Sequence, residues 1–344
     1  MTGGARLPLG KRIAFSLLVT VGFLVLAAVA GEIILRVKGE KPWEPVPRVA
    51  PVIEPGGSLF APEAARGYAL LPGRFTVKQR LVTWHVTNAA ADHRLTRPAG
   101  GGAAGADAVW IFGDSYTYGW GVEDDETYAW RLQAARPDLD VLNFGIGGYS
   151  TLQSLLELDA ALAAGGRPKL VILGYSSFHD GRNAMLRGNR KAWVPWLSRF
   201  PRVPVAWLED GKLRHDLVPV VYHEWPLQRA SALVNFLEEK YDKAQVLTSH
   251  AQAVSEALIA EMAARCRAAG VDFLLLGVHR SDRTAQVLAW ARAQGIRTLD
   301  VSVDQTLPEY AVPGDGHPSA KAHAEFAAKI VPELPAKPAQ GGGG

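Results

Sequence analysis

The sequence predicts an α/β domain built on a parallel β-sheet, preceded by a membrane-spanning helix and a short β-rich lead-in. From residue 107 onward, short apolar runs alternate with amphipathic segments of helical length. This alternation is typical of a parallel sheet covered by helices on both faces. Near the N-terminus an uncharged apolar run covers residues 13–31, and residues 74–94 alternate and are rich in Val, Thr and Trp. These observations predict the anchor and the lead-in.

The N-terminal segment is predicted to be a signal anchor over residues 13–37, with residues 1–12 in the cytoplasm. Residues 13–31 are 19 residues without charge or proline, close to the roughly 20 needed to cross the hydrocarbon core. The alternative is a signal peptide cleaved after the small residues 28–30. The anchor is favoured because residues 33–37 continue the apolar run past Glu32. In either case the domain is predicted to lie outside the cytoplasm.

Residues 38–106 are predicted to form a spacer and the lead-in. Residues 38–63 are expected to be an extended, semi-rigid spacer because they are rich in proline. Residues 74–94 are expected to form one or two antiparallel strands on the edge of the main domain, and residues 97–106 are expected to form a loop. The spacer prolines are Pro42, Pro45, Pro47, Pro51, Pro55 and Pro62.

The main domain is predicted to cover residues 107–334, and the tail 335–344 is expected to be disordered. Residues 181–248 interrupt the pattern. Such a long insertion is either a functional lid or wall or a structural excursion packed by its own aromatic residues. Strands are expected at 108–112, 140–144, 170–175, 273–276 and 296–301, and helices at 125–136, 151–164, 249–269, 283–294 and 319–331.

Composition excludes several classes of function. The 344-residue chain has 37 basic and 34 acidic residues and a net charge of +3, which gives no electrostatic basis for nucleic-acid binding. Cys266 is the only cysteine, so an internal disulfide and a cysteine-based zinc site are excluded. Its helical spacing from Leu258 and Met262 predicts a buried core thiol. No metal and no organic cofactor is expected.

Ser115 is the candidate nucleophile. It follows the apolar run 109–112 and the turn formed by Gly113 and Asp114, and reacting groups in α/β sheets lie just past the carboxyl ends of strands. The alternative is that Asp114 and Ser115 only cap the next helix. Asp315 and His317 precede the last helix and supply an orienting carboxylate and a base, which complete a nucleophile–base–orienter set.

The Gly-rich turn after the second strand, residues 143–150, is the candidate oxyanion site. There the backbone N–H groups can approach a substrate without obstruction by side chains. The order of a Ser, a Gly turn and an Asp–His pair, each after a predicted strand, is more informative than any one of them. Thr117 replaces the last Gly of a Gly-x-Ser-x-Gly motif, which argues against an α/β-hydrolase elbow.

These three segments resemble the conserved blocks of the SGNH (GDSL-type) hydrolases: residues 113–119 the first block, 143–151 the second and 315–323 the last. The resemblance covers roughly residues 107–332. It implies a flavodoxin-like three-layer α/β/α fold. It implies Ser115 as nucleophile, His317 as base and Asp315 as its partner, with the backbone N–H groups of Ser115 and Gly148 as oxyanion donors. The anchor and lead-in resemble a membrane-anchored bacterial branch that includes polysaccharide-modifying enzymes.

The chain departs from the family at the third block, which ends in Asn-Asp and supplies an Asn side chain as a further oxyanion donor. Aligned through Asp180, the Asn position is His179; aligned through Gly174, it is Ser176; Asn183 is a third candidate. We take His179 as the expected donor. Many relatives also have two residues between the Asp and the His of the last block, whereas this chain has one.

The resulting prediction is a serine esterase anchored by one helix in a bacterial inner membrane, with its catalytic domain in the periplasm. It removes acyl groups, acetyl above all, from a glycan or cell-envelope polymer, with lipid or small esters as less favoured substrates. The alternatives are an O-acyltransferase with the same catalytic set and a non-catalytic glycan-binding or assembly protein. Tyr118, Trp120 and the tryptophans at 193–225 either stack on sugars or belong to the core. Candidate substrate contacts are Asp114, Tyr116, Tyr149, Ser176 and Asn183.

Overall fold

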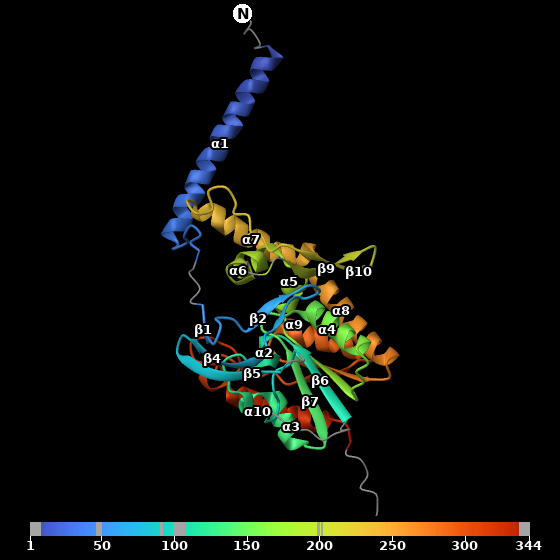
Figure 1. The fold of residues 1–344 in the computed structure, drawn as a ribbon. Coiled ribbons are helices and arrows are strands. Elements are labelled where there is room, and N and C mark those ends of the chain that lie inside the picture. Colours follow the sequence, from blue (N-terminus) through green and yellow to red (C-terminus); the bar gives the residue numbers. More distant parts are fainter. Residues whose placement is uncertain are drawn as a thin grey trace, which may run out of the picture. The chain divides into compact units, whose positions relative to one another are not determined.

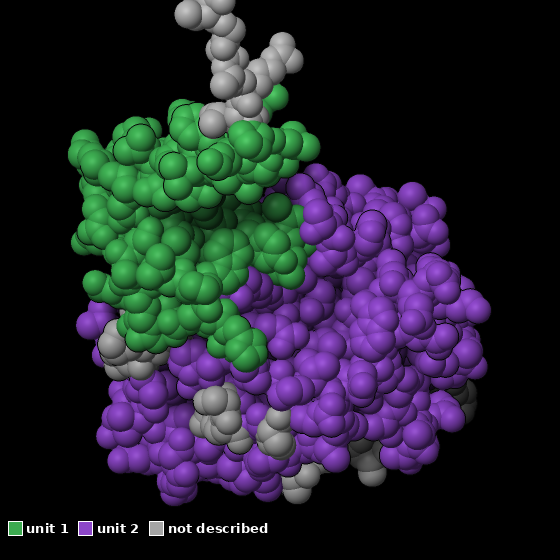
Figure 2. Space-filling model, turned by 90° about the horizontal axis from the view of Figure 1, so that it is seen from above, with its two compact units in different colours: residues 1–47, 222–245 green, residues 48–221, 246–344 purple. Residues whose placement is uncertain are grey.

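A computed structural model describes residues 8–45, 50–89, 92–98, 107–197, 200 and 202–336 (Figure 1). Most of the predicted loop 97–106 and of the predicted disordered tail 335–344 lies outside the described residues. The chain divides into two compact units, coloured separately in Figure 2. One unit contains residues 1–47 and 222–245, and the other contains residues 48–221 and 246–344.

The larger unit is built around a parallel sheet, as predicted. Within the described residues five strands pair in the order β12-β11-β8-β6-β7, and every neighbouring pair is parallel. These strands are near-continuous apolar runs because both faces of the sheet are covered. Their bounds are β6 (Asp107–Gly113), β7 (Leu139–Gly145), β8 (Leu170–Tyr175), β11 (Asp272–Gly277) and β12 (Arg297–Asp300).

Helices cover the two faces of the sheet and complete a three-layer α/β/α arrangement (Figure 1). One face packs against α4 (Thr151–Ala163), α8 (Ala251–Ala268) and α9 (Asp282–Ala293). The other packs against α3 (Tyr128–Ala135) and α10 (Ala320–Ile330). Cys266 is fully buried on α8, which confirms the predicted core thiol. α3 begins later than expected because the Thr127 side chain caps it, accepting from Trp130 N–H at 3.2 Å.

The lead-in contains more regular structure than the sequence predicts. β1 (Val52–Glu54), β4 (Gly73–Gln79) and β5 (Val82–Asn88) form an antiparallel sheet, and β2 (Phe60–Glu63) pairs with β3 (Gly67–Leu70). β1 and β2 occupy part of the segment expected to be an extended spacer, so that prediction is wrong there. Backbone bridges from Asn88 to Arg94 and from Arg94 to Asn143 of β7 join the lead-in to the edge of the main sheet, as expected.

The first part of the insertion belongs to the larger unit and contributes to its core. It contains α5 (His179–Asn183), α6 (Arg187–Leu197) and the antiparallel pair β9 (Val203–Glu209) and β10 (Lys212–Val218). Trp196 packs edge-on against Phe60 and Tyr68 of the lead-in, with ring centroids 5.6 and 5.2 Å apart. Aromatic packing thus ties this part of the insertion to the lead-in.

The smaller unit is organised around α1 (Leu9–Val37). Among the described helices α1 alone has the length and apolarity needed to cross a membrane, with a mean hydropathy of 2.6 and none of its apolar window buried. These properties fit a membrane anchor or a signal sequence. The Glu32 carboxylate accepts from the N–H groups of Ala232 and Leu233 at 3.0 and 2.8 Å, and so caps the first turn of α7 (Ala232–Thr248).

The buried His323 on α10 gives the fold a predictable pH dependence. Burial lowers the pKa of His323 to about 3, whereas an unfolded histidine titrates near 6.5. Stability from this group is therefore fully present above pH 6.5 and is lost as the pH falls from there toward 3. Between pH 7 and pH 5 the loss approaches about 2 kcal/mol. Thermal unfolding at both pH values should show a larger fall for wild type than for His323→Gln; equal falls would contradict this origin.

Candidate active site

Ser115 lies at a sharp turn between strand β6 and a short helix. β6 ends at Gly113, and Ser115 is the first residue of α2 (Ser115–Tyr118). The Asp114 carboxylate caps this helix by accepting from Tyr116 N–H at 2.8 Å. A Cβ atom on Gly113 would lie 2.3 Å from Thr117 Oγ1, so only glycine permits this turn. The hydroxyl of Ser115 is thus held at the carboxyl end of β6.

His317 lies beside Ser115, although 202 positions separate them in the chain. Its Nε2 atom is 2.9 Å from Ser115 Oγ, and its Nδ1 atom contacts Asp315 Oδ1. An ionised carboxylate only accepts hydrogen bonds, so Nδ1 carries the proton and Nε2 accepts from the serine hydroxyl. The loop folds back to allow this arrangement, with Val312 N–H donating to the carbonyl of His317 at 2.7 Å.

Asp315 is held in its charged form. Burial opposes its ionisation, but the hydrogen bond from His317 and the positive charge of Arg80 hold the pKa of Asp315 below its usual value. Ser115, His317 and Asp315, which the sequence predicts as nucleophile, base and orienter, therefore lie in one hydrogen-bonded chain. This geometry permits proton transfer from the hydroxyl to the imidazole.

Gly148 lies in a tight turn after β7. Tyr149 N–H donates to the carbonyl of Ile146 at 3.1 Å, and Gly148 has φ +84°, which marks a type II turn that favours glycine at this position. Within the part of the chain that the structure describes, neither the Gly148 N–H nor the Ser115 N–H has a hydrogen-bond acceptor. Two backbone donors are thus available where the sequence predicts an oxyanion site.

Aromatic rings surround the Gly148 turn. A Cβ atom on Gly148 would lie 2.8 Å from the hydroxyl oxygen of Tyr68, 3.0 Å from the Trp193 ring and 3.1 Å from the Trp196 ring. The first ring comes from the lead-in and the other two from α6. Side chains from the lead-in and from α6 therefore pack closely against the Gly148 turn.

His179, the residue expected to replace the family Asn, has both ring nitrogens engaged. It is fully buried; its Nε2 atom lies 3.2 Å from Asp114 Oδ2 and its Nδ1 atom 3.1 Å from Thr151 Oγ1. Burial raises the pKa of Asp114, but the hydrogen bond and charge of His179 and the charge of Arg182 outweigh it and lower that pKa. The geometry favours His179 as support for Asp114 over the expected oxyanion role.

Ser176 and Asn183, the two other candidates for the family Asn position, differ in their hydrogen bonding. The Ser176 side chain is fully buried at the end of β8, and its hydroxyl has no hydrogen-bond partner in the described part of the chain. Asn183 instead accepts from Leu152 N–H and donates to Ser255 Oγ, both at 2.9 Å. Asn183 therefore links α5 to α4 and α8, and Ser176 keeps an available donor.

The two candidate tyrosines also differ in position. The Tyr116 ring packs edge-on against His317, with centroids 5.5 Å apart, and burial raises the pKa of Tyr116 to about 12. The Tyr149 hydroxyl donates to the carbonyl of Tyr68 at 2.6 Å and is buried. Tyr116 thus lies against the base, whereas Tyr149 joins the Gly148 turn to the lead-in.

Sequence reasoning missed the polar residues that the lead-in brings to this site. Gln79 donates to Asp315 Oδ2 at 3.1 Å across 236 positions, and Trp120 Nε1 donates to Gln79 Oε1 at 2.9 Å. No motif or spacing marks these contacts, because they depend on how the lead-in packs. Within the described residues no group of three or more His, Cys, Asp or Glu side chains has a metal-binding arrangement.

Comparison with known proteins gives a family match and similar folds. The model of the GDSL-like Lipase/Acylhydrolase family matches residues 111–325. None of the curated proteins compared with the chain matches it. Similar solved structures include a lipolytic protein of the G-D-S-L family from Desulfitobacterium hafniense (13% identity, 66% of this chain and 99% of that chain, TM-score 0.39).

Two further solved structures are similar to this chain. One is a GDSL-like lipase from Bacteroides thetaiotaomicron (16% identity, 69% of this chain and 92% of that chain, TM-score 0.36). The other is a catalytic mutant of Axe2, an acetylxylan esterase from Geobacillus stearothermophilus (14% identity, 66% and 93%, TM-score 0.35). The family match covers more than half of the chain and decides the assignment. The chain belongs to the GDSL-like lipase/acylhydrolase family and is a hydrolase that acts on ester bonds.

Proposed function

We propose that this chain is a membrane-anchored, extracytoplasmic serine esterase that removes short acyl groups, acetyl above all, from a glycan or cell-envelope ester. The observation that carries the proposal is the 2.9 Å contact between Ser115 Oγ and His317 Nε2, with Asp315 on the other ring nitrogen. A serine hydroxyl becomes a good nucleophile when an oriented imidazole takes its proton.

In the proposed mechanism, Ser115 Oγ attacks the ester carbonyl carbon while His317 Nε2 takes the hydroxyl proton. The resulting oxyanion accepts hydrogen bonds from the N–H groups of Ser115 and Gly148. The carbon–oxygen bond to the alcohol then breaks, and His317 returns its proton to that alcohol. Water attacks the acyl-serine in the second half with His317 as base, the carboxylic acid leaves, and the Ser115 hydroxyl is restored.

The preference for short acyl groups rests on the surroundings of Gly148. The Tyr68, Trp193 and Trp196 side chains lie beside the Gly148 turn, and we expect them to lie near an acyl group whose carbonyl oxygen accepts from the Gly148 N–H. Because these side chains are bulky, we expect a methyl group to be accommodated better than a long acyl chain. Of the three, Trp193 and Trp196 are partly exposed and could stack on a sugar ring, whereas Tyr68 is buried. Both features favour an O-acetylated glycan over a lipid ester.

The membrane part of the proposal rests on α1. Its apolar run follows basic residues at its start and has the length needed to span the hydrocarbon core. Glu32, just past this run, caps α7. The proposed anchor therefore also contacts residues 222–245 of the insertion, which belong to the same unit. We propose that α1 is retained and that the esterase domain lies on the periplasmic side of a bacterial inner membrane.

An O-acyltransferase with the same acyl-enzyme is the second candidate. The experiment that separates the two uses the full chain in detergent micelles with a chromogenic aryl acetate, and measures phenol and free acetate together. A hydrolase releases equal amounts of both without an acceptor. A transferase releases phenol in proportion to added glycan, with acetate recovered on that glycan. The second outcome would overturn the hydrolase proposal.

We propose Ser176 as the third oxyanion donor, because its buried hydroxyl is available while both ring nitrogens of His179 are engaged. Ser176→Ala is expected to lower kcat about 10²–10³-fold with little change in KM. Ser154→Ala is the matched control, since Ser154 on α4 also has a buried hydroxyl without a partner in the described residues. If Ser176→Ala retains wild-type kcat, Ser176 is not the donor.

A further inference from the structure

We propose that Gln79, at the end of strand β4 in the lead-in, is a positioning residue that fixes the orientation of Asp315 and thereby of His317. In this proposal the lead-in supplies a residue that orients the acid–base pair of the active site. This inference rests on the proposed function, in which Asp315 and His317 form the acid–base pair. It concerns residues of the larger unit only.

The side-chain amide of Gln79 joins two groups around the base. Gln79 is the last residue of β4 and pairs with Val82 across the hairpin turn. Its Nε2 donates to Asp315 Oδ2 at 3.1 Å, and its Oε1 accepts from Trp120 Nε1 at 2.9 Å. An indole N–H can only donate, so the amide oxygen must face Trp120 and the NH₂ group must face the carboxylate. Only one orientation of the amide satisfies both partners.

The contact from Gln79 leaves the Asp315 carboxylate with both oxygens engaged. Oδ1 accepts from His317 and Oδ2 accepts from Gln79, so rotation of the carboxylate breaks a hydrogen bond. Trp120, which is held by Gln79, lies with its ring 6.2 Å from the His317 ring. Tyr116 packs on the same imidazole at 5.5 Å. Gln79 thus acts on His317 through the carboxylate and through an aromatic neighbour.

The residue next to Gln79 strengthens the same junction. The Arg80 guanidinium donates to the carbonyl of Gly314, the residue before Asp315. Its positive charge also helps to lower the pKa of Asp315. The hairpin tip therefore contacts both the backbone and the carboxylate of the loop that carries the acid–base pair.

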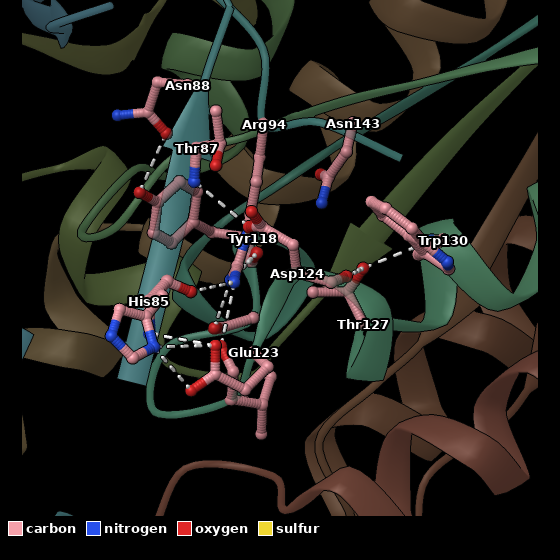
Figure 3. Close-up of polar contacts among 12 residues, drawn as sticks. His85, Thr87, Asn88, Arg94, Tyr118, Glu123, Asp124, Thr127, Trp130 and Asn143 are labelled. Atoms are coloured by element: carbon pink, nitrogen blue, oxygen red, sulfur yellow. Dashed lines mark hydrogen bonds and ion pairs between the residues drawn. The ribbon is translucent and has the colours of Figure 1, made fainter. Parts of the chain in front are cut away.

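A second contact from the lead-in holds the segment after the nucleophile (Figure 3). Arg94 is fully buried and donates to the carbonyls of Tyr118, Gly119 and Val122 at 3.0, 2.5 and 2.8 Å. It also forms an ion pair with Asp124 at 2.8 Å. The lead-in therefore supports both sides of the serine–histidine contact, Ser115 through Arg94 and His317 through Gln79.

The test compares two variants of Gln79 with a control in the full chain in detergent. Gln79→Met removes both hydrogen bonds at similar volume and should lower kcat about 10–100-fold with little change in KM, because one bond to a charged group is lost. Lys78→Met is the matched control; Lys78 is exposed, pairs only loosely with Glu54 at 3.4 Å, and should leave kcat unchanged.

Gln79→Glu tests the positioning role through a change in pH dependence, which a purely structural role of Gln79 would not produce. The new carboxylate still accepts from Trp120 but adds negative charge beside Asp315, which favours protonated His317. The ionisable groups facing this pair are Tyr116 and Arg80, with His323 sensing the charge of His317 from α10. The acidic limb of the kcat/KM profile should move to higher pH by about one unit.

The same shift should appear in the NMR titration of the His317 ring, which needs no substrate. This measurement separates the two claims. If wild type hydrolyses esters no faster than Ser115→Ala, the proposed function is wrong. The His317 titration would still test whether Gln79 positions His317. An unchanged titration midpoint in Gln79→Glu, together with unchanged kcat in Gln79→Met, would overturn the positioning role.

Discussion

Replacing Ser115 with Ala is expected to lower kcat for a chromogenic acetyl ester about 10⁶-fold, close to the uncatalysed rate. The attacking atom is removed, and the remaining oxyanion donors cannot form an acyl-enzyme. Losses of this size follow removal of the nucleophile from other serine triads. The substitution removes one oxygen atom, so the fold should persist. The rate is measured by phenol release from the full chain in detergent, with the unfolding midpoint recorded in parallel.

Ser177→Ala is the control for this experiment. Ser177 lies at the same edge of the sheet, and its hydroxyl contacts His279 Nδ1 at 3.1 Å rather than His317 or Asp315. Its loss should change kcat by less than a factor of about ten. A Ser115→Ala variant that is folded and retains activity would show that hydrolysis does not pass through this serine.

Replacing Asp315 with Asn is expected to lower kcat about 10⁴-fold. The amide offers N–H to the ring, so His317 Nδ1 can become an acceptor and the proton can move to Nε2, where it blocks acceptance of the Ser115 proton. The shape of the site changes little, so KM should remain close to wild type. The measurement is the steady-state rate of aryl acetate hydrolysis across the neutral pH range.

Asp304→Asn serves as the control for Asp315. Asp304 lies in a nearby loop, where it accepts from Thr306 and pairs with Arg280; within the described residues it forms no hydrogen bond or ion pair with His317 or Ser115. Its variant should keep near-wild-type kcat. If Asp315→Asn behaved like Asp304→Asn, the carboxylate would not orient the imidazole.

The parallel sheet and its covering helices could be predicted because each strand is a local apolar run. β8, for example, has the predicted bounds. Strands β1, β2 and β3 of the lead-in were harder to predict because they have only three or four residues each. β1 has three residues and pairs with β4, whose register with it depends on packing. β9 and β10, in the insertion, were not predicted either.

The residues of the central hydrogen-bonded chain could be proposed from sequence because Ser115, Asp315 and His317 follow predicted elements in a recognisable order. The hydrogen-bond partners of His179 could not be predicted from the sequence, because the direction of its ring depends on Asp114 and Thr151, which lie on other elements. The contact of Gln79 with Asp315 joins the end of β4 to a loop 236 positions away. Such contacts depend on tertiary packing and have no local pattern.

The most direct test of the account is covalent labelling of the full chain with a fluorophosphonate, followed by peptide mapping. A serine activated by His317 and oriented by Asp315 should form one adduct, located on Ser115, and labelling should be much slower in Asp315→Asn. An adduct on another residue, or equal labelling rates in wild type and Asp315→Asn, would contradict the assignment of Ser115, His317 and Asp315 as the catalytic set.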